Sequence, residues 1–185
     1  MKLFSLFPIL IAAIFVQNIP VSKWNDKPLQ KISVGTLTEE NYTLVLKALA
    51  NLDNKTSNDT IIIKYDYEKE SCWNRLDKQD DNYIKTIIAN GNKRILENET
   101  KRKNISVYQI SEGKSRTNKI IKWNDQVKID TDKTIHNLLF TKKAMCGNSI
   151  LITPSRKFII LKSDSHFELL DYSKKEITKI FNTLM

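Results

Sequence analysis

Residues 60–68 constrain the fold of this chain most strongly, because they alternate as the residues of a β-strand do. Ile61, Ile63, Tyr65 and Tyr67 would project from one side of the strand, and the residues between them from the other. Shorter β-rich segments follow at residues 82–89, 93–97, 104–111, 119–129, 134–142, 149–153 and 157–162. Short strands that recur about every 8–14 residues are typical of an antiparallel barrel or sandwich.

The segments on either side of these strands carry less uniform patterns. Residues 38–52 fit both an amphipathic helix and a strand, and the strand-rich sequence after them favours a strand. Asn90-Gly91 is a typical turn between the two strands of a hairpin. Ser173 and Glu176 have the spacing of a capping box, and apolar residues with helical periodicity follow them. The sequence therefore predicts a mainly β fold, an antiparallel up-and-down barrel of about eight strands with one C-terminal amphipathic helix.

The N-terminus has the composition of a secretory signal peptide. Lys2 precedes an almost wholly apolar run up to Val16, which is shorter than the roughly 20 residues that span a membrane. We therefore expect a signal peptide at residues 1–22 and a single domain at residues 23–185; an uncleaved anchor is the alternative. No second apolar run of spanning length occurs in the sequence. We expect a secreted, extracellular protein without stable membrane insertion.

Two further features suit an extracellular location. The chain has two cysteines, Cys72 and Cys146, which in an oxidising compartment most simply form one disulfide bond. That bond would close a loop of about 75 residues and contribute about 4 kcal/mol of stability in the chain-entropy model; a bridge between two molecules is the alternative. Glycosylation acceptor sequences occur at Asn41, Asn54, Asn58, Asn98 and Asn104.

Charge and motifs argue against most enzyme classes. The 30 Lys and Arg residues outnumber the 21 Asp and Glu residues, giving a net charge of +9, which suits either solubility or an anionic partner. No metal-binding Cys/His spacing, HExxH motif, phosphate loop or GxSxG motif is present. We expect no enzymatic activity, metal or cofactor. The remaining enzymatic alternative is a small basic ribonuclease-like hydrolase that pairs His136, His166 and Glu168.

The C-terminal third resembles the secreted lipocalins, especially the tick salivary amine-binding type and the acid-glycoprotein and apolipoprotein M types. The resemblance is carried by residues 138–141, Cys146, residues 149–153 and 158–161, the helix from Ser173, residues 54–72, and Trp24. The chain lacks the family's Gly-x-Trp signature, and Lys142 stands where the family usually has Asp. The resemblance implies a barrel that encloses one small ligand.

The expected function is that of a secreted, non-enzymatic carrier or scavenger of a small amphipathic, hydrophobic or anionic ligand. Inward-facing side chains would contact the ligand inside the barrel: Tyr65, Tyr67, Trp123 and Asp125. Aromatic rings with a polar group suit an amphipathic guest, and an inward carboxylate could hold an amine. The alternative for the aromatic residues is a filled core, and for Asp125 a bulge or strand end. The alternative function is a secreted interaction protein that binds a host protein or a sulfated glycan through its basic surface; no nucleic acid partner is expected.

Overall fold

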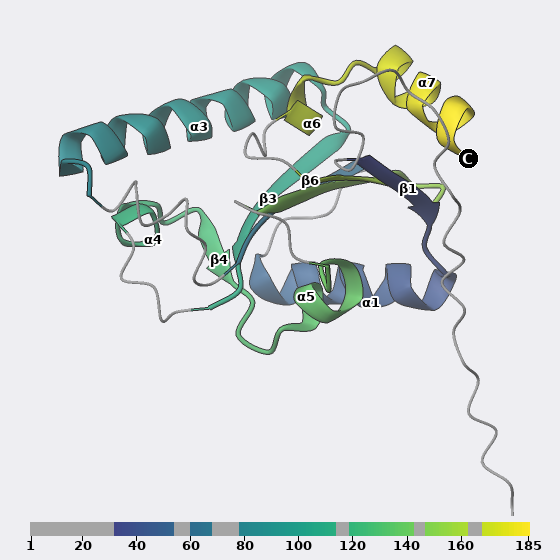
Figure 1. Cartoon of the computed structure of the whole chain (residues 1–185), viewed down its shortest axis with the longest axis horizontal. Coiled ribbons are helices and arrows are strands. Elements are labelled where there is room, and N and C mark those ends of the chain that lie inside the picture. The colour runs from purple at the N-terminus through teal and green to yellow at the C-terminus, as the bar shows by residue number, and fades with distance from the viewer. Residues whose placement is uncertain (1–31, 54–59, 68–77, 114–118, 143–146, 163–167) are drawn as a thin grey trace, which may run out of the picture.

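The centre of the structure, a computed structural model, is one open six-stranded mixed sheet with the order β1-β6-β5-β2-β3-β4 (Figure 1). The described residues are 32–53, 60–67, 78–113, 119–142, 147–162 and 168–185. The strands are β1 (Ile32–Thr36), β2 (Thr60–Asp66), β3 (Ile105–Ser111), β4 (Val127–Ile129), β5 (Asn148–Ile152) and β6 (Lys157–Lys162). The helices are α1 (Glu39–Leu52), α3 (Asp81–Lys101), α4 (Lys119–Trp123), α5 (Thr134–Leu139), α6 (Glu168–Asp171) and α7 (Lys174–Leu184).

Strand direction divides the sheet into two halves. β2, β3 and β4 run parallel, and α3 connects the first two of them. β5 lies antiparallel to β2 on its other side, β6 lies antiparallel to β5, and β1 pairs antiparallel with β6. The turn between β5 and β6 places Arg156 at a positive φ of 66°. The central strand β2 is thus the point where the parallel half meets the antiparallel half.

Helices cover both faces of the sheet. In Figure 1, α3, α6 and α7 lie on one face, and α1 and α5 lie on the other. β2 carries a run of isoleucines because both of its faces are buried, as is typical of a central strand in an α/β protein. Ile61 and Ile63 pack into the core under α1 and α5, whereas Ile62 packs into the core on the opposite face. The chain therefore has two hydrophobic cores separated by one sheet.

The predicted closed barrel is wrong. The sheet is open and mixed, and its order begins at β1 and ends at β4. A barrel would need the first and last strands to pair, and parallel β2 and β3 are joined by a crossover helix that an up-and-down barrel does not contain. The prediction of a mainly antiparallel β fold is wrong for the same reason.

Several predicted strands are helices in the structure. Residues 38–52 form α1, whose N-cap Thr38 accepts a hydrogen bond from the Asn41 backbone amide at 3.1 Å. The two strands predicted around Asn90-Gly91 belong to the single helix α3, with Asp80 as its N-cap. Residues 119–129 are divided between α4 and β4, and residues 134–142 contain α5. Burial against the sheet, rather than local β-propensity, decides the conformation of these segments.

The predicted C-terminal helix is confirmed as α7. Ser173 accepts a hydrogen bond from the Glu176 backbone amide at 3.2 Å, and the Glu176 carboxylate accepts one from the Ser173 backbone amide at 2.7 Å. These two bonds form the predicted capping box and satisfy backbone groups that would otherwise have no partner at the start of the helix.

This capping box predicts a pH-dependent helix. Hydrogen bonds from the Ser173 side chain and backbone lower the pKa of Glu176. A lowered pKa in the folded state stabilises the helix at pH values above the ordinary glutamate pKa, and that contribution disappears as the pH falls through the lowered value. We expect hydrogen exchange at the start of α7 to accelerate as the pH falls through this range, after correction for intrinsic rates. Ser173→Ala should remove most of this dependence, and an unchanged profile in that variant would contradict the assignment.

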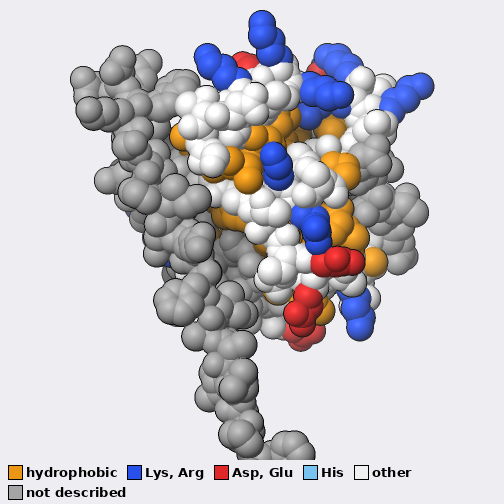
Figure 2. Space-filling model, turned by 90° about the vertical axis from the view of Figure 1, so that its right-hand side faces the viewer, with side chains coloured by type: hydrophobic (Ala, Val, Ile, Leu, Met, Phe, Trp, Pro, Cys, Tyr) orange, Lys and Arg blue, Asp and Glu red, His pale blue; other side chains and the backbone are white. Residues whose placement is uncertain are grey.

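Figure 2 shows the side of the molecule on which α7 and β1 lie. Lys and Arg side chains stand out in the upper part of this face, and α7 contributes the exposed Lys174, Lys175 and Lys179. Part of the positive charge of the chain is thus concentrated along the solvent side of α7. None of the described helices is long and apolar enough to cross a membrane.

Candidate functional site

The two cysteine-bearing segments leave the sheet at one end of two neighbouring strands. β2 ends at Asp66, and after Tyr67 the chain continues into residues 68–77, which carry Cys72 and lie outside the described residues. β5 begins at Asn148, and residues 143–146 before it, with Cys146, also lie outside the described residues. Because β2 and β5 are antiparallel and Tyr65 pairs with Asn148, the last residues of β2 and the first residues of β5 lie side by side at the same end of the two strands.

Side chains tie the described ends of these two segments together. The Tyr67 hydroxyl donates a hydrogen bond to the Phe140 carbonyl at 3.0 Å. The Asn148 side-chain amide donates to the Tyr67 hydroxyl and, at 3.0 Å, to the Lys142 carbonyl. Tyr67 and Asn148 are almost completely buried. The starting points of both cysteine-bearing segments are therefore fixed by buried contacts, not left free at the surface.

Gly147 separates Cys146 from β5 and has a left-handed backbone. Its φ of 90° is one that side chains other than glycine rarely adopt. Gly147 is also buried. Any residue with a Cβ would strain the chain at this position, directly before β5.

A buried ion pair lies on the opposite face of the same end of β2. The Lys64 ammonium is 3.3 Å from the Asp66 carboxylate, and the two side chains are 10% and 8% exposed. Asp66 precedes Cys72 by six residues in the sequence. Charges this well buried are costly to desolvate unless they are paired. The pair therefore places two compensating charges at this end of β2.

Asp130 organises the polar groups below Tyr67. Its carboxylate accepts hydrogen bonds from the Tyr65 hydroxyl at 3.1 Å and from the backbone amides of Ile135 and His136 at 3.2 and 2.8 Å. Burial, and then the charge of Asp130, raise the pKa of Tyr65 far above its usual value, so Tyr65 stays a neutral donor. The Tyr65 ring also stacks on Phe140, with centroids 4.6 Å apart. The contacts around Asp130 and Tyr65 therefore form a packed polar network and not a cavity.

The structure separates the four residues predicted to contact a ligand. Tyr65 and Tyr67 are completely buried in the core under α1 and α5. Trp123 is 37% exposed at the end of α4, and its ring faces the ammonium groups of Lys85 at 4.1 Å and Lys122. Asp125 lies exposed just after α4. The two tyrosines fill a core, the alternative considered for them above, and they do not surround a ligand together with Trp123 and Asp125.

The other predicted site residues are only partly within the described residues. Asn41 lies on α1, Asn98 lies on α3, and Asn104 is exposed before β3. The side-chain amide of Asn98 donates to the Arg94 carbonyl at 3.0 Å. Cys72, Cys146, Asn54, Asn58 and His166 lie outside the described residues. Glycosylation and the disulfide bond remain predictions.

The described residues also show what could hold a metal or a proton. No cluster of three or more His, Asp or Glu side chains able to hold a metal ion occurs in the part of the chain that the structure describes. His136 lies on α5 with its Nδ1 3.0 Å from the Asn137 side-chain oxygen. His166, its predicted partner in a hydrolase, is not among the described residues, so the two histidines are not brought together there.

Sequence reasoning missed the ion pair and the contacts around Asn148. Lys64 and Asp66 alternate with apolar residues, so they fall among the residues that the alternation places on the side of the strand opposite Tyr65 and Tyr67. Charged residues directly at the end of a long apolar strand were the available signal for a site at its carboxyl end. Asn148 follows Cys146 closely in the sequence, yet its contact with Tyr67 joins residues that are 81 positions apart.

A second buried polar cluster fastens α3 to the parallel half of the sheet. The amide side chains of Asn92, Asn124 and Gln109 form a closed ring: Asn92 donates to Asn124 at 3.1 Å, Asn124 donates to Gln109 at 3.3 Å, and Gln109 donates to Asn92 at 2.8 Å. Asn92 belongs to α3, Gln109 to β3, and Asn124 follows α4. The ring joins three elements that are far apart in the sequence.

We expect Asn92→Ala to destabilise the protein. The substitution leaves the Gln109 side-chain donor without its acceptor in a largely buried place, which costs about 2 kcal/mol. It also removes one of the two donors to the Asn124 side-chain oxygen. Asn82→Ala changes an exposed asparagine of the same helix and should shift the unfolding free energy by less than about 0.5 kcal/mol. Urea unfolding of both variants measures the difference, and equal effects would show that the amide ring adds no stability.

Comparisons with known proteins found similarity only at the level of solved structures, and it is low. No family model matches the chain, and no curated protein matches it. A solved structure of the thioredoxin domain of a thiol-disulfide oxidoreductase from Bacteroides vulgatus is similar, with 13% identity and a TM-score of 0.35 over 62% of this chain and 79% of that one. A structure described as a thiol:disulfide interchange protein DsbE from Chlorobium tepidum is also similar, with 13% identity and a TM-score of 0.36 over 70% of this chain and 82% of that one.

The open mixed sheet corrects the expectations that rested on the lipocalin resemblance. The resemblance itself is wrong, because the open sheet encloses no barrel interior in which a small hydrophobic ligand could be carried. The expectation of a non-enzymatic carrier rested on that barrel and falls with it. Strand order and helix placement give the chain an open α/β architecture, with a parallel β-α-β unit beside an antiparallel hairpin.

Proposed function

We propose that this chain is a thiol–disulfide exchange protein whose reactive pair is Cys72 and Cys146. The observation that supports the proposal is that the segment with Cys72 follows β2, the segment with Cys146 precedes β5, and these two strand ends lie side by side. Cys72 follows Tyr67 by five residues, so its Cα lies within about 18 Å of that of Tyr67. Cys146 precedes Asn148 by two residues, so its Cα lies within about 7 Å of that of Asn148. The two segments can therefore bring their Cα atoms to the roughly 4.4–6.8 Å that a disulfide requires.

The proposed reaction is a reversible two-electron exchange. A thiolate of a partner dithiol attacks the Cys72 sulfur of the oxidised chain, and Cys146 leaves as a thiolate and takes up a proton. The second partner thiolate then attacks the partner sulfur of this mixed disulfide, and Cys72 leaves as a thiolate. The partner becomes a disulfide, the chain becomes a dithiol, and two protons pass from the partner thiols to the two cysteines. The substrates are therefore thiol-containing or disulfide-containing partner proteins.

Cys72 is assigned as the cysteine that partners attack. It belongs to a ten-residue segment that ends at the exposed Lys78, whereas Cys146 adjoins the buried Gly147. A partner thiol needs access to the sulfur that it attacks. The buried Lys64–Asp66 pair six residues before Cys72 supplies fixed charges on this side of the edge.

The signal peptide is part of the same proposal. Removal of residues 1–22 during export would deliver a chain with Cys72 and Cys146 to an oxidising compartment, where disulfide chemistry persists. Expression in insect cells should yield a secreted protein whose N-terminus begins near Lys23. Glycosidase treatment should lower its mass if Asn41, Asn98 or Asn104 carries a glycan. Retention of the intact N-terminus on a membrane-bound product would contradict the export step.

Peptide mapping under non-reducing conditions tests the pairing. After free thiols are blocked, a protease digest of the secreted protein should contain one linked peptide pair that joins Cys72 to Cys146. Reduction should then lower the unfolding free energy by about 4 kcal/mol, because the cross-link closes a long loop. Two alkylated cysteines, or a bridge between two molecules, would contradict the proposal.

A further inference from the structure

The outer edge of β3 is paired with a strand along only part of its length. β4 pairs with residues Gln109 to Ser111 and no further among the described residues. Before β4 the chain turns away, because the Val127 backbone amide donates to the Asn124 carbonyl. The first half of β3, from Ile105 to Tyr108, therefore has β2 on one side and no described strand on the other.

Alternate residues of this uncovered half direct their backbone N–H and C=O groups away from β2. The Thr60 amide donates to the Asn104 carbonyl. The backbone N–H and C=O groups of the even-numbered residues of β3 therefore point toward β2, and those of the odd-numbered residues point toward the open side. The bond from the Asp130 amide to the Ser111 carbonyl agrees with this assignment. The outward amide of Val107 is held by the Glu99 carboxylate at 2.8 Å, in the place where the carbonyl of a neighbouring strand would lie. One side chain thus substitutes for a missing strand.

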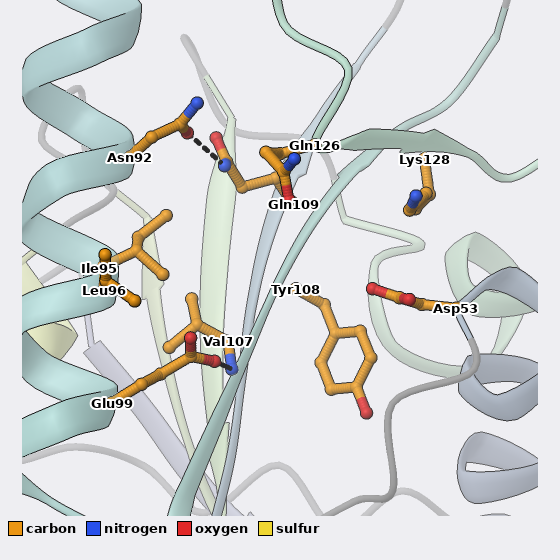
Figure 3. A pocket seen from close by; sticks show the side chains of 10 residues that line it. All are labelled: Asp53, Asn92, Ile95, Leu96, Glu99, Val107, Tyr108, Gln109, Gln126 and Lys128. Carbon is orange, nitrogen blue, oxygen red and sulfur yellow. Dashed lines mark hydrogen bonds between the residues drawn. The ribbon is translucent and has the colours of Figure 1, made fainter.

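A groove of about 390 Å³ follows this edge. In Figure 3, α3 forms one wall with Ile95, Leu96 and Glu99, β3 lies in the middle, and Asp53 projects from the end of α1 on the other side. The groove therefore has α3 on one side, the residue that follows α1 on the other, and a strand edge as its floor, which is the space that a further strand of this sheet would occupy.

The Tyr108 hydroxyl and the Asp53 carboxylate lie along the α1 side of the groove. The Tyr108 hydroxyl is buried and has no hydrogen-bond partner among the described residues, although Tyr108 lines the groove. Burial raises the pKa of this hydroxyl, and the negative charges of Asp53 and Glu99, which also line the groove, raise it further. A cationic donor at this place would give the hydroxyl a partner and offset the two negative charges. Among the described residues that line the groove, Lys128 is the one cationic residue.

We propose that this groove binds an extended segment of a partner protein in which apolar residues alternate with lysine or arginine. Side chains of an added strand point alternately to the two faces of the sheet. One set would meet the apolar Ile95 and the exposed Leu96 on α3, and the other would meet Tyr108 and Asp53. The backbone of the segment would donate to the outward carbonyl of Val107. This site is separate from the proposed cysteine pair and does not depend on it.

An NMR titration of the full chain tests the site. The probe is an acetylated and amidated six-residue peptide of alternating valine and lysine. We expect saturable shifts of the amide signals of Val107, Tyr108 and Leu96. The signals of β1, the strand at the other edge of the sheet, should stay in place and serve as the internal control.

Matched variants and peptides separate the parts of the proposal. Tyr108→Phe removes a hydroxyl that lacks a partner and should leave folding intact. This variant and Asp53→Asn should each weaken peptide binding about threefold to fivefold. A peptide N-methylated at alternate amides, or one with glutamate in place of lysine, should bind at least about tenfold more weakly. No saturable shift at Val107 and Tyr108, equal binding of the N-methylated peptide, or peptide-independent shifts with protein concentration, which would indicate pairing of two chains, would overturn the proposal.

Discussion

Cys72→Ser should reduce thiol–disulfide exchange by at least about a hundredfold, because the proposal assigns to Cys72 the thiolate that attacks a partner's disulfide and the sulfur that a partner thiolate attacks in the reverse direction. The chain has only two cysteines, so removal of Cys72 leaves Cys146 without an intramolecular partner. The rate can be measured as the reduction of a disulfide-bonded model protein in the presence of dithiothreitol. The Cys72→Ser chain should be no faster than dithiothreitol alone.

Cys146→Ser should have a different effect, and the difference identifies the attacked cysteine. This variant keeps Cys72 but lacks the thiol that resolves a mixed disulfide, so it should accumulate covalent adducts with partner proteins on non-reducing gels. Cys72→Ser should accumulate far fewer adducts. Ser71→Ala is a matched control next to Cys72 and should keep the exchange rate within about twofold of the wild type. Equal adduct formation by both cysteine variants would contradict the assignment of Cys72.

Asp130→Ala should destabilise the protein by about 3 kcal/mol, the largest effect we expect from a substitution outside the cysteines. The carboxylate accepts from the Tyr65 hydroxyl and from the backbone amides of Ile135 and His136, and Asp130 is 3% exposed. Its removal leaves these three donors without that acceptor, and a buried donor without a partner costs the full desolvation penalty. Thermal and urea unfolding at neutral pH measure the loss.

The adjacent acidic residue provides the control for this prediction. Asp132 is exposed, two residues from Asp130, and Asp132→Ala should change the unfolding free energy by no more than about 0.5 kcal/mol. Tyr65→Phe removes one of the three donors and should cost clearly less than Asp130→Ala. If Asp130→Ala and Asp132→Ala were equally stable, the Asp130 contacts would not support the end of the sheet.

The strands that the sequence predicts correctly are those whose own side chains decide their conformation. β2, β3, β5 and β6 coincide with β-rich segments that the sequence predicts, and the sheet buries all four at their centres. α7 was predicted from its capping box and its apolar spacing, both of which are local signals. These features depend on neighbours within a few positions, so they can be recognised without the rest of the chain.

The helices were missed because their signals are weak next to their β-forming residues. α3 places its buried Ile84, Ile88 and Ile95 four and seven residues apart, which is a helical spacing. Asn90-Gly91 within it suggested a hairpin turn, but the ring that Asn92 forms with β3 and the residue after α4 holds this part of the helix on the sheet. A tertiary contact of this kind has no local signature. Because those helices were read as strands, parallel pairing and an open sheet could not be foreseen.

The candidate site was predicted only in part. Cys72 and Cys146 were recognised as a pair, but as a static cross-link in a barrel. Their proposed role depends on β2 and β5 being antiparallel neighbours, which follows from the order of the whole sheet. The alternation of Lys64 and Asp66 with apolar residues does not predict their burial, since nothing nearby in the sequence indicates that helices cover both faces of the strand.

A redox titration of the cysteine pair tests the central claim most directly. The protein is equilibrated in glutathione buffers of graded potential, quenched by alkylation, and the oxidised fraction is measured by mass. We predict a single two-electron transition of Cys72 and Cys146 with a midpoint between about −270 and −120 mV, the range of exchange-active pairs. A pair that stays oxidised below about −300 mV would be a structural disulfide, and that result, or two thiols that never pair, would contradict the claim.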